Sequence, residues 1–182
     1  MILHEACKKG NLKIVKEILN SSKIDFNELN EYGETSLTIA CLYNHIEIIK
    51  YMMTNDNVDI NKANKHGDSP FLIMCYNNNI KMIEYMLKIR NIDINKVNNE
   101  GYTPFAIACE EGYLNMVKYM MNNEIFNLNK NNDLGDTPFA IACFEGHLEI
   151  IKYMMNTEKI DFNKANNYEE TPFLQASCNI II

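Results

Sequence analysis

The stretch Gly101 to Gly112 reads GYTPFAIACEEG and Gly135 to Gly146 reads GDTPFAIACFEG, so nearly the same twelve residues occur twice, 34 positions apart. The rest of the chain follows this period, with a hydroxyl residue recurring as Thr35, Ser69, Thr103, Thr137 and Thr171. All four prolines come directly after one of these, at Pro70, Pro104, Pro138 and Pro172. Ser or Thr followed by Pro is typical of a helix start, because the hydroxyl caps a free backbone N–H and Pro needs no partner.

Each 34-residue unit also carries the signals of a second helix. The first helix is expected to end at a residue that tolerates the left-handed conformation, namely Gly10, Asn44, Asn78, Gly112 or Gly146. Segments such as LNMVKYMM and LEIIKYMM then place apolar residues at helical spacing. A polar turn that contains Gly33, Gly67, Gly101 or Gly135 closes the unit. A helix–turn–helix–turn unit of this size cannot bury its apolar face alone, so the units are expected to stack.

The stretch TPFAIACEEGYLNMVKYMM, with a DINK segment and a Gly-containing turn, resembles the ankyrin repeat. Tetratricopeptide repeats share the period, but their pattern of Trp or Tyr, Leu-Gly and a late Pro is absent. The resemblance covers essentially the whole chain and implies an all-α ankyrin-repeat solenoid of stacked helix–turn–helix units with hairpin-like turns between them. We expect a single array over 1–182, with repeats at about 1–34, 35–68, 69–102, 103–136 and 137–170 and a half repeat at 171–182.

The sequence departs from the family pattern in three places. The family's His is kept only as His4, so its hydrogen bond with Thr is doubtful in the other repeats. Glu169 stands where a turn Gly is expected, which predicts a distorted last hairpin. The longer connection after the second helix holds an apolar residue that we interpret as a plug between repeats, at Ile24, Val58, Ile92, Phe126 and Ile160.

Composition excludes several classes of function. A net charge of −7 disfavours nucleic acid as a ligand, because Lys and Arg provide most of that affinity. No apolar run is long enough for a membrane span, and MILHEACKKG is not ordered like a signal peptide. We therefore expect an intracellular, cytoplasmic protein whose cysteines stay reduced. Five of the six cysteines follow the 34-residue period, and neither they nor the His residues have zinc-ligand spacing, so we expect small core residues and no metal or cofactor.

The resemblance implies protein–protein recognition through a concave side built from the turn tips and the exposed part of each first helix. Matched position by position, that side carries aromatic residues among acidic ones. Surface aromatics commonly anchor interfaces, and acidic neighbours steer basic ligands. We expect a basic segment of a partner protein, of unknown identity, to bind there; alternatively, the acids are only a solvated face and the aromatics pack on neighbouring loops. The predicted partner-binding residues are Tyr32, Tyr43, Tyr76, Tyr102, Glu100, Glu110, Glu111, Asp136, Phe144 and Glu145.

An enzymatic function finds no support in the sequence, and no catalytic residue is predicted. The four His residues lie in separate repeats, and neither a nucleophile elbow nor a phosphate-binding glycine loop is present. The alternative function is a recognition arm of a larger multidomain protein whose enzymatic or channel activity lies outside these residues. The half repeat ends in the apolar SCNIII, which suggests truncation or self-association through this end.

Overall fold

A computed structural model describes residues 2–21, 24–89 and 91–178. Within these ranges the chain forms eleven α-helices and no strand. Two compact units divide it, Met1–Asp93 and Ile94–Ile182. The first unit holds α1 (Ile2–Lys8), α2 (Leu12–Leu19), α3 (Ser36–Leu42), α4 (Ile46–Met52), α5 (Pro70–Tyr76) and α6 (Ile80–Met86). The second holds α7 (Pro104–Glu110), α8 (Leu114–Met121), α9 (Pro138–Phe144), α10 (Leu148–Met155) and α11 (Pro172–Cys178).

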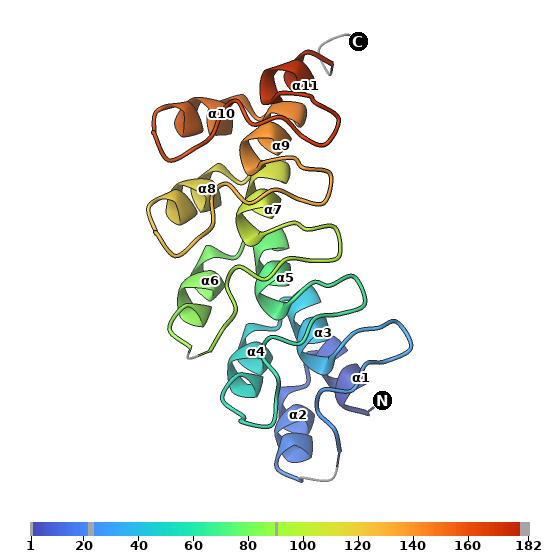
Figure 1. The fold of residues 1–182 in the computed structure, drawn as a ribbon. Helices are drawn as coiled ribbons and strands as arrows, with labels where there is room; N and C mark the ends of the chain where they lie inside the picture. The colour runs from blue at the N-terminus through green and yellow to red at the C-terminus, as the bar shows by residue number, and fades with distance from the viewer. Residues whose placement is uncertain (1, 22–23, 90, 179–182) are drawn as a thin grey trace. The chain divides into compact units, whose positions relative to one another are not determined.

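Within each unit the helices pair as the repeat predicts. Each odd-numbered helix from α1 to α9 packs on the next helix of its own repeat and on the odd-numbered helix of the following repeat in the same unit (Figure 1). The even-numbered helices form a second row, in which α2 contacts α4 and α8 contacts α10. The expected all-α fold of stacked helix–turn–helix units is confirmed; its extension as a single array over 1–182 stays a prediction.

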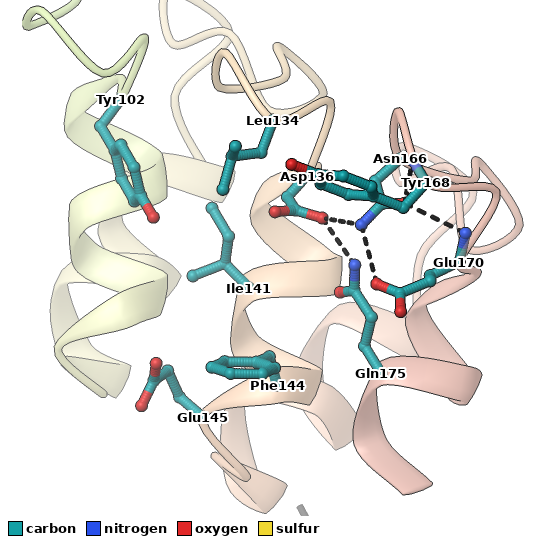
Figure 2. Close-up of a pocket in the computed structure, with 10 residues that line it drawn as sticks. All are labelled: Tyr102, Leu134, Asp136, Ile141, Phe144, Glu145, Asn166, Tyr168, Glu170 and Gln175. Atoms are coloured by element: carbon teal, nitrogen blue, oxygen red, sulfur yellow. Dashed lines mark hydrogen bonds between the residues drawn. The ribbon is translucent and has the colours of Figure 1, made fainter. Parts of the chain in front are cut away.

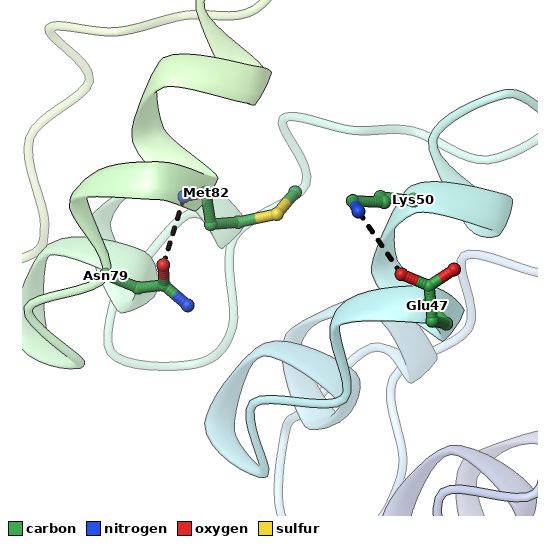
Figure 3. Close-up of polar contacts among 4 residues, drawn as sticks. All are labelled: Glu47, Lys50, Asn79 and Met82. Atoms are coloured by element: carbon green, nitrogen blue, oxygen red, sulfur yellow. Dashed lines mark hydrogen bonds and ion pairs between the residues drawn. The ribbon is translucent and has the colours of Figure 1, made fainter.

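The predicted helix starts are confirmed by their caps. The Thr103 hydroxyl oxygen accepts from the Ala106 N–H at 3.1 Å, and Thr35, Ser69 and Thr137 cap α3, α5 and α9 in the same way. Second helices begin less uniformly. Figure 3 shows Asn79 capping α6 through the Met82 N–H at 3.0 Å, near an exposed Lys50–Glu47 pair on α4. The side chains at the corresponding positions before α4, α8 and α10 make no such bond.

The turn residues adopt the predicted left-handed backbone, with φ of 54° at Asn44 and 74° at Gly112. The expected distortion at Glu169 is wrong. Its φ is 65°, and its N–H donates to Asn166 O at 3.1 Å, as Gly135 N–H donates to Asn132 O at 3.0 Å. The last turn therefore keeps the common geometry, with the strain of a non-glycine residue at positive φ.

The core lies between the two helix rows of each unit. In α5, α7 and α9 the first six residues are all buried, and the five periodic cysteines are buried free thiols, as predicted. Three of the predicted plugs, Val58, Phe126 and Ile160, are buried as well. The prediction for Ile24 is wrong: its side chain is 47% exposed, and Phe26 two residues later is buried instead.

Asparagine side chains join neighbouring repeats within each unit. Asn129 donates to Lys159 O at 2.7 Å and accepts from the Asp161 N–H at 3.0 Å. Three more side chains form the same pair of hydrogen bonds with the backbone of the following turn, namely those of Asn27, Asn61 and Asn95. In each case the bonded backbone belongs to the next repeat.

Candidate functional site

The turns that carry most of the predicted site are built around a second column of asparagines. We use "tip turn" for the five residues that begin at Asn30, Asn64, Asn98, Asn132 or Asn166. In each, the first residue's side-chain oxygen accepts from the N–H groups two and four residues later; at Asn132 these bonds reach Leu134 and Asp136 at 3.0 and 2.9 Å. The bonds hold the intervening side chains outward on a rigid turn.

Tip turns of one unit are also joined through backbone bonds. Within the second unit, Asp133 N–H donates to Glu100 O, and Asn167 N–H donates to Leu134 O, both at 3.0 Å. These bonds fix the spacing of side chains that stand on successive turns. A partner that contacts two turns therefore meets a preorganised surface.

A groove of about 280 Å³ lies in the second unit between its tip turns and its odd-numbered helices. Figure 2 shows Tyr102 at one side, Phe144 and Glu145 below it at the end of α9, and Tyr168 at the opposite rim. Phe144 is 47% and Tyr168 is 68% exposed, so both rings are open to a ligand. The groove is lined by Tyr102, Leu134, Asp136, Ile141, Phe144, Glu145, Asn166, Tyr168, Glu170 and Gln175.

Two of the acidic groove residues accept hydrogen bonds from side-chain amide groups. Asp136 Oδ1 accepts from Asn166 at 2.9 Å and from Gln175 at 2.6 Å, as the dashed lines in Figure 2 mark. Glu170 accepts from the Asn166 amide at 3.2 Å. These bonds connect the last two tip turns and α11, so Asp136 and Glu170 are held in place and their negative charges are stabilised by hydrogen bonds.

The other acids next to the groove lie close enough to one another to interact electrostatically. Among the residues that the structure describes, Glu100, Glu110, Glu111 and Glu145 form no ion pair. Burial raises the pKa of Glu110 above its usual value, and the charges of Glu111, Glu145 and Glu100 add to that rise. A hydrogen bond from Tyr102 acts in the opposite direction. The local field is therefore negative and uncompensated.

Tyr102 connects the aromatic and acidic parts of this site. Its pKa is raised by burial, and then by the negative charges of Glu110, Asp136 and Glu100. The phenol accordingly stays protonated and can donate, while its ring forms one side of the groove. The structure thus gathers the seven predicted residues of the second unit around one groove, although Glu100, Glu110 and Glu111 lie outside its lining.

The three remaining predicted residues lie in the first unit. Tyr32 and Tyr43 line a different cavity of about 550 Å³, together with residues of α1 and α3 such as Lys8 and Leu42. This cavity contains charges of both signs: Glu5 pairs with Lys9 at 3.0 Å, the Lys8 ammonium lies 5.9 Å from the centre of the Tyr43 ring, and Glu31 and Glu34 also line it. Tyr76 is half-buried and lines neither this cavity nor the groove.

Six lining residues are not among the predicted partner-binding residues: Leu134, Ile141, Asn166, Tyr168, Glu170 and Gln175. Two of them leave a periodic signal. Asn166 belongs to the tip-turn asparagine column, and Gln175 interrupts a column that reads Ile39, Ile73, Ile107 and Ile141. Gln175 is buried, and its amide reaches the Asp136 carboxylate, which explains a polar residue at an otherwise apolar position.

We searched the described residues for a metal site, a reactive thiol and a membrane-spanning helix. No group of three His, Cys, Asp or Glu residues there is arranged to hold a metal ion. Burial raises the pKa of Cys143 to about 11 and of Cys7 to about 12, so these thiols are protonated and unreactive at neutral pH. Over the same described ranges, every helix is too short or too polar to cross a bilayer.

Comparison with protein families gives three matches. Residues 3–53 match a model described as ankyrin repeats in many copies, and residues 56–132 match a three-copy model of ankyrin repeats. Residues 134–167 match a single ankyrin repeat. In a comparison with individual curated proteins, nothing matches the chain.

Proposed function

Because the chain belongs to the ankyrin repeat family, whose repeats are non-enzymatic modules for protein–protein interaction, we propose that the groove of the second unit binds a basic segment of a partner protein. The observation that carries this proposal is the pairing of exposed aromatic rings with unpaired carboxylates at one groove. Phe144 and Tyr168 offer apolar contact area, and Glu145, which follows Phe144 in the chain, forms no ion pair with any described residue.

The physical argument combines two effects. Aromatic side chains on a rigid surface are frequent binding hot spots, because they bury much area at little entropic cost. Unpaired carboxylates attract cations at long range and orient them on arrival. A basic, extended or helical segment satisfies both groups, whereas an acidic segment meets repulsion.

The test is fluorescence anisotropy with a labelled dodecapeptide of Arg, Lys, Ser and Gly, and with its counterpart in which Glu replaces the basic residues. Removing Tyr102 and Phe144 with the double change Tyr102→Ala, Phe144→Ala should weaken binding of the basic peptide at least about fivefold, the factor of about 1 kcal/mol that defines a hot spot. Met155→Ala, which truncates an exposed apolar residue on α10, is the matched control and should leave the affinity unchanged.

Equal affinity of the double variant and the wild type for the basic peptide would show that the groove is not the binding site, provided that circular dichroism shows the same helix content for both proteins. Equal binding of the acidic peptide would show that contact area and not charge determines binding. The alternative function, a recognition arm of a larger multidomain protein, uses the same face and makes the same predictions for it.

Self-association is a second candidate, supported by the apolar surface of α11. Phe173 and Leu174 are each 49% exposed, although the Phe173 ring also packs edge-on against Phe139 at 6.0 Å between ring centres. The sequence's expectation about the apolar 180–182 lies outside the described residues. Sedimentation should show a concentration-dependent mass that Leu174→Glu abolishes; a single monomeric mass at all concentrations would exclude this candidate.

A further inference from the structure

We propose that the groove of the second unit recognises the guanidinium group of an arginine side chain in preference to a lysine ammonium. The inference rests on the proposed function, because it names the residue type that the groove reads in the basic segment. It follows from the shape of the groove, the state of its carboxylates and the composition of the chain itself.

The walls of the groove favour a flat, weakly hydrated cation. Tyr102, Phe144 and Tyr168 present rings, and Leu134 and Ile141 add aliphatic surface, within a volume of about 280 Å³. A guanidinium stacks on aromatic faces and loses little hydration there, whereas an ammonium is strongly hydrated and loses more. Apolar walls of this kind therefore discriminate between the two cations, which an open acidic surface does not.

The carboxylates suit a donor with several N–H groups. Asp136 Oδ1 and Glu170 Oε2 are already bound by amides, Asp136 by Asn166 and Gln175 and Glu170 by Asn166, whereas Glu145 has no amide partner among the described residues, so we assign the ligand to Glu145 first. Glu110 lies next to the lining, accepts a hydrogen bond from Tyr102 and is half-buried. A planar fork of N–H donors reaches a carboxylate with two parallel bonds and has further donors for a neighbouring acceptor.

The composition of the chain also favours a preference for arginine, because basic residues on other copies of the protein compete for the groove. Of its 17 Lys and Arg residues, only Arg90 is an arginine. A groove that accepted any cation would be open to the many lysines on other copies of the same protein. A preference for arginine removes nearly all of these competitors, which is how specificity against unwanted partners is commonly obtained.

The experiment compares three labelled nonapeptides that share two flanking lysines and differ only in the central residue, which is arginine, lysine or citrulline. Citrulline keeps the shape of arginine and removes its charge. The arginine peptide should bind the full chain about tenfold more tightly than the lysine peptide, an advantage between the strengths of an exposed and a desolvated cation–π contact. The citrulline peptide should bind no better than the lysine peptide.

Two groove variants locate the preference. Phe144→Leu removes the ring but keeps apolar volume, and Glu145→Gln removes the charge but keeps the shape; each should reduce the advantage of arginine to less than about threefold. Glu158→Gln changes the net charge equally at an exposed position outside the groove and should keep the full preference.

The outcomes separate this inference from the proposed function. Equal affinity for the arginine and lysine peptides, both lost in the Tyr102→Ala, Phe144→Ala variant, would overturn the arginine preference and leave the basic-segment groove standing. An arginine preference that survives in both Phe144→Leu and Glu145→Gln would place its recognition elsewhere and overturn the inference. If no peptide binds, the proposed function and the inference both fail.

Discussion

At the scale of single residues, Glu110 is the acidic residue of the site that is affected by both burial and the charges of its neighbours. Its carboxylate is half-buried among Glu111, Glu145 and Glu100, and its pKa is raised mainly by burial. A negative charge kept there without a counter-ion works against folding at neutral pH and in favour of binding a cation. Function and stability therefore oppose each other at this residue, as is common at binding sites.

The pH dependence of folding tests this opposition. Because the folded chain holds the Glu110 proton more tightly than the unfolded chain, the stability linked to this group is present below its unfolded pKa and is lost as pH rises through its folded pKa. Glu110→Gln should therefore raise the free energy of unfolding at about pH 7, by less than about 1 kcal/mol since the group is half-exposed, and should give no gain at about pH 3.

Urea unfolding of wild type and variant at the two pH values measures the effect. Glu158→Gln is the control, because Glu158 is exposed and lies in the turn after α10. An equal gain from Glu158→Gln would mean that net charge alone is responsible. A loss of stability in Glu110→Gln at about pH 7 would contradict the assigned cause of the shift.

Two glycines at equivalent positions separate backbone strain from crowding. Gly112 and Gly146 have φ of 74° and 73°. A Cβ on Gly112 would lie 2.7 Å from His147 Cε1, whereas a Cβ on Gly146 would meet nothing within 4 Å. Gly146→Ala should cost about 1–2 kcal/mol from the left-handed backbone alone, and Gly112→Ala should cost more.

The origin of the excess is tested by removing the ring. In a His147→Ala background, which also removes the bond of the ring to Glu110 O, Gly112→Ala should cost only as much as Gly146→Ala does in the wild type. Thermal unfolding of the four variants gives the comparison. If the excess persists without the ring, the contact with His147 is not its cause.

At the scale of elements, the sequence predicted the repeating unit well because its signals are local. Caps such as Thr103 act within four residues, and the left-handed turns depend on one residue each. The groove was predicted less completely, because its lining comes from four successive segments of the repeat pattern, from Tyr102 in 69–102 to Gln175 in 171–182. Gln175 lines the groove and donates a hydrogen bond to Asp136, which lies 39 residues earlier in the chain. No local sequence pattern predicts a bond over that separation.

The prediction for Ile24 failed for a related reason. The 34-residue period placed it with Val58 and Phe126, but in the first repeat the neighbouring Phe26 is buried. A periodic pattern identifies the position that a side chain occupies in the repeat. Which of two nearby apolar side chains becomes buried depends on packing, which the period does not specify.

Coupling between neighbouring repeats is testable at the asparagine bridges. Asn129→Ala removes the bonds to Lys159 O and from the Asp161 N–H, and should lower the free energy of unfolding by about 1–3 kcal/mol. Asn163→Ala is the matched control: this residue has the same repeat position, is exposed, and makes no side-chain hydrogen bond within the described residues. Chemical denaturation measures both, and equal losses would show that the bridge does not couple the repeats.

At the scale of the whole molecule, both units use the same kind of core, to which α1, α3, α5, α7 and α9 each contribute a buried cysteine. Burial raises the pKa of Cys41, Cys75 and Cys109 even further than that of Cys7. Thiols that stay protonated in the folded chain and ionise in the unfolded chain weaken folding in alkaline solution. Their stabilising contribution is present below the unfolded pKa and declines as pH rises towards the folded one.

Thermal unfolding should therefore occur at progressively lower temperature above about pH 9. A variant with Cys41→Ala and Cys75→Ala has fewer buried thiols and should show a shallower decline, although its stability at about pH 7 is lower because of the lost packing. Parallel pH profiles for wild type and variant would show that groups other than the thiols control alkaline unfolding.

The central claim is that the groove of the second unit is the partner-binding site for a basic segment. The most direct measurement is a titration of the isotope-labelled full chain with the basic dodecapeptide, followed by NMR chemical shifts. The largest shifts should fall on Tyr102, Phe144, Glu145 and Tyr168 and should be absent from α8 and α10. Shifts concentrated on α8 and α10, or on the cavity lined by Tyr32 and Tyr43, would contradict it.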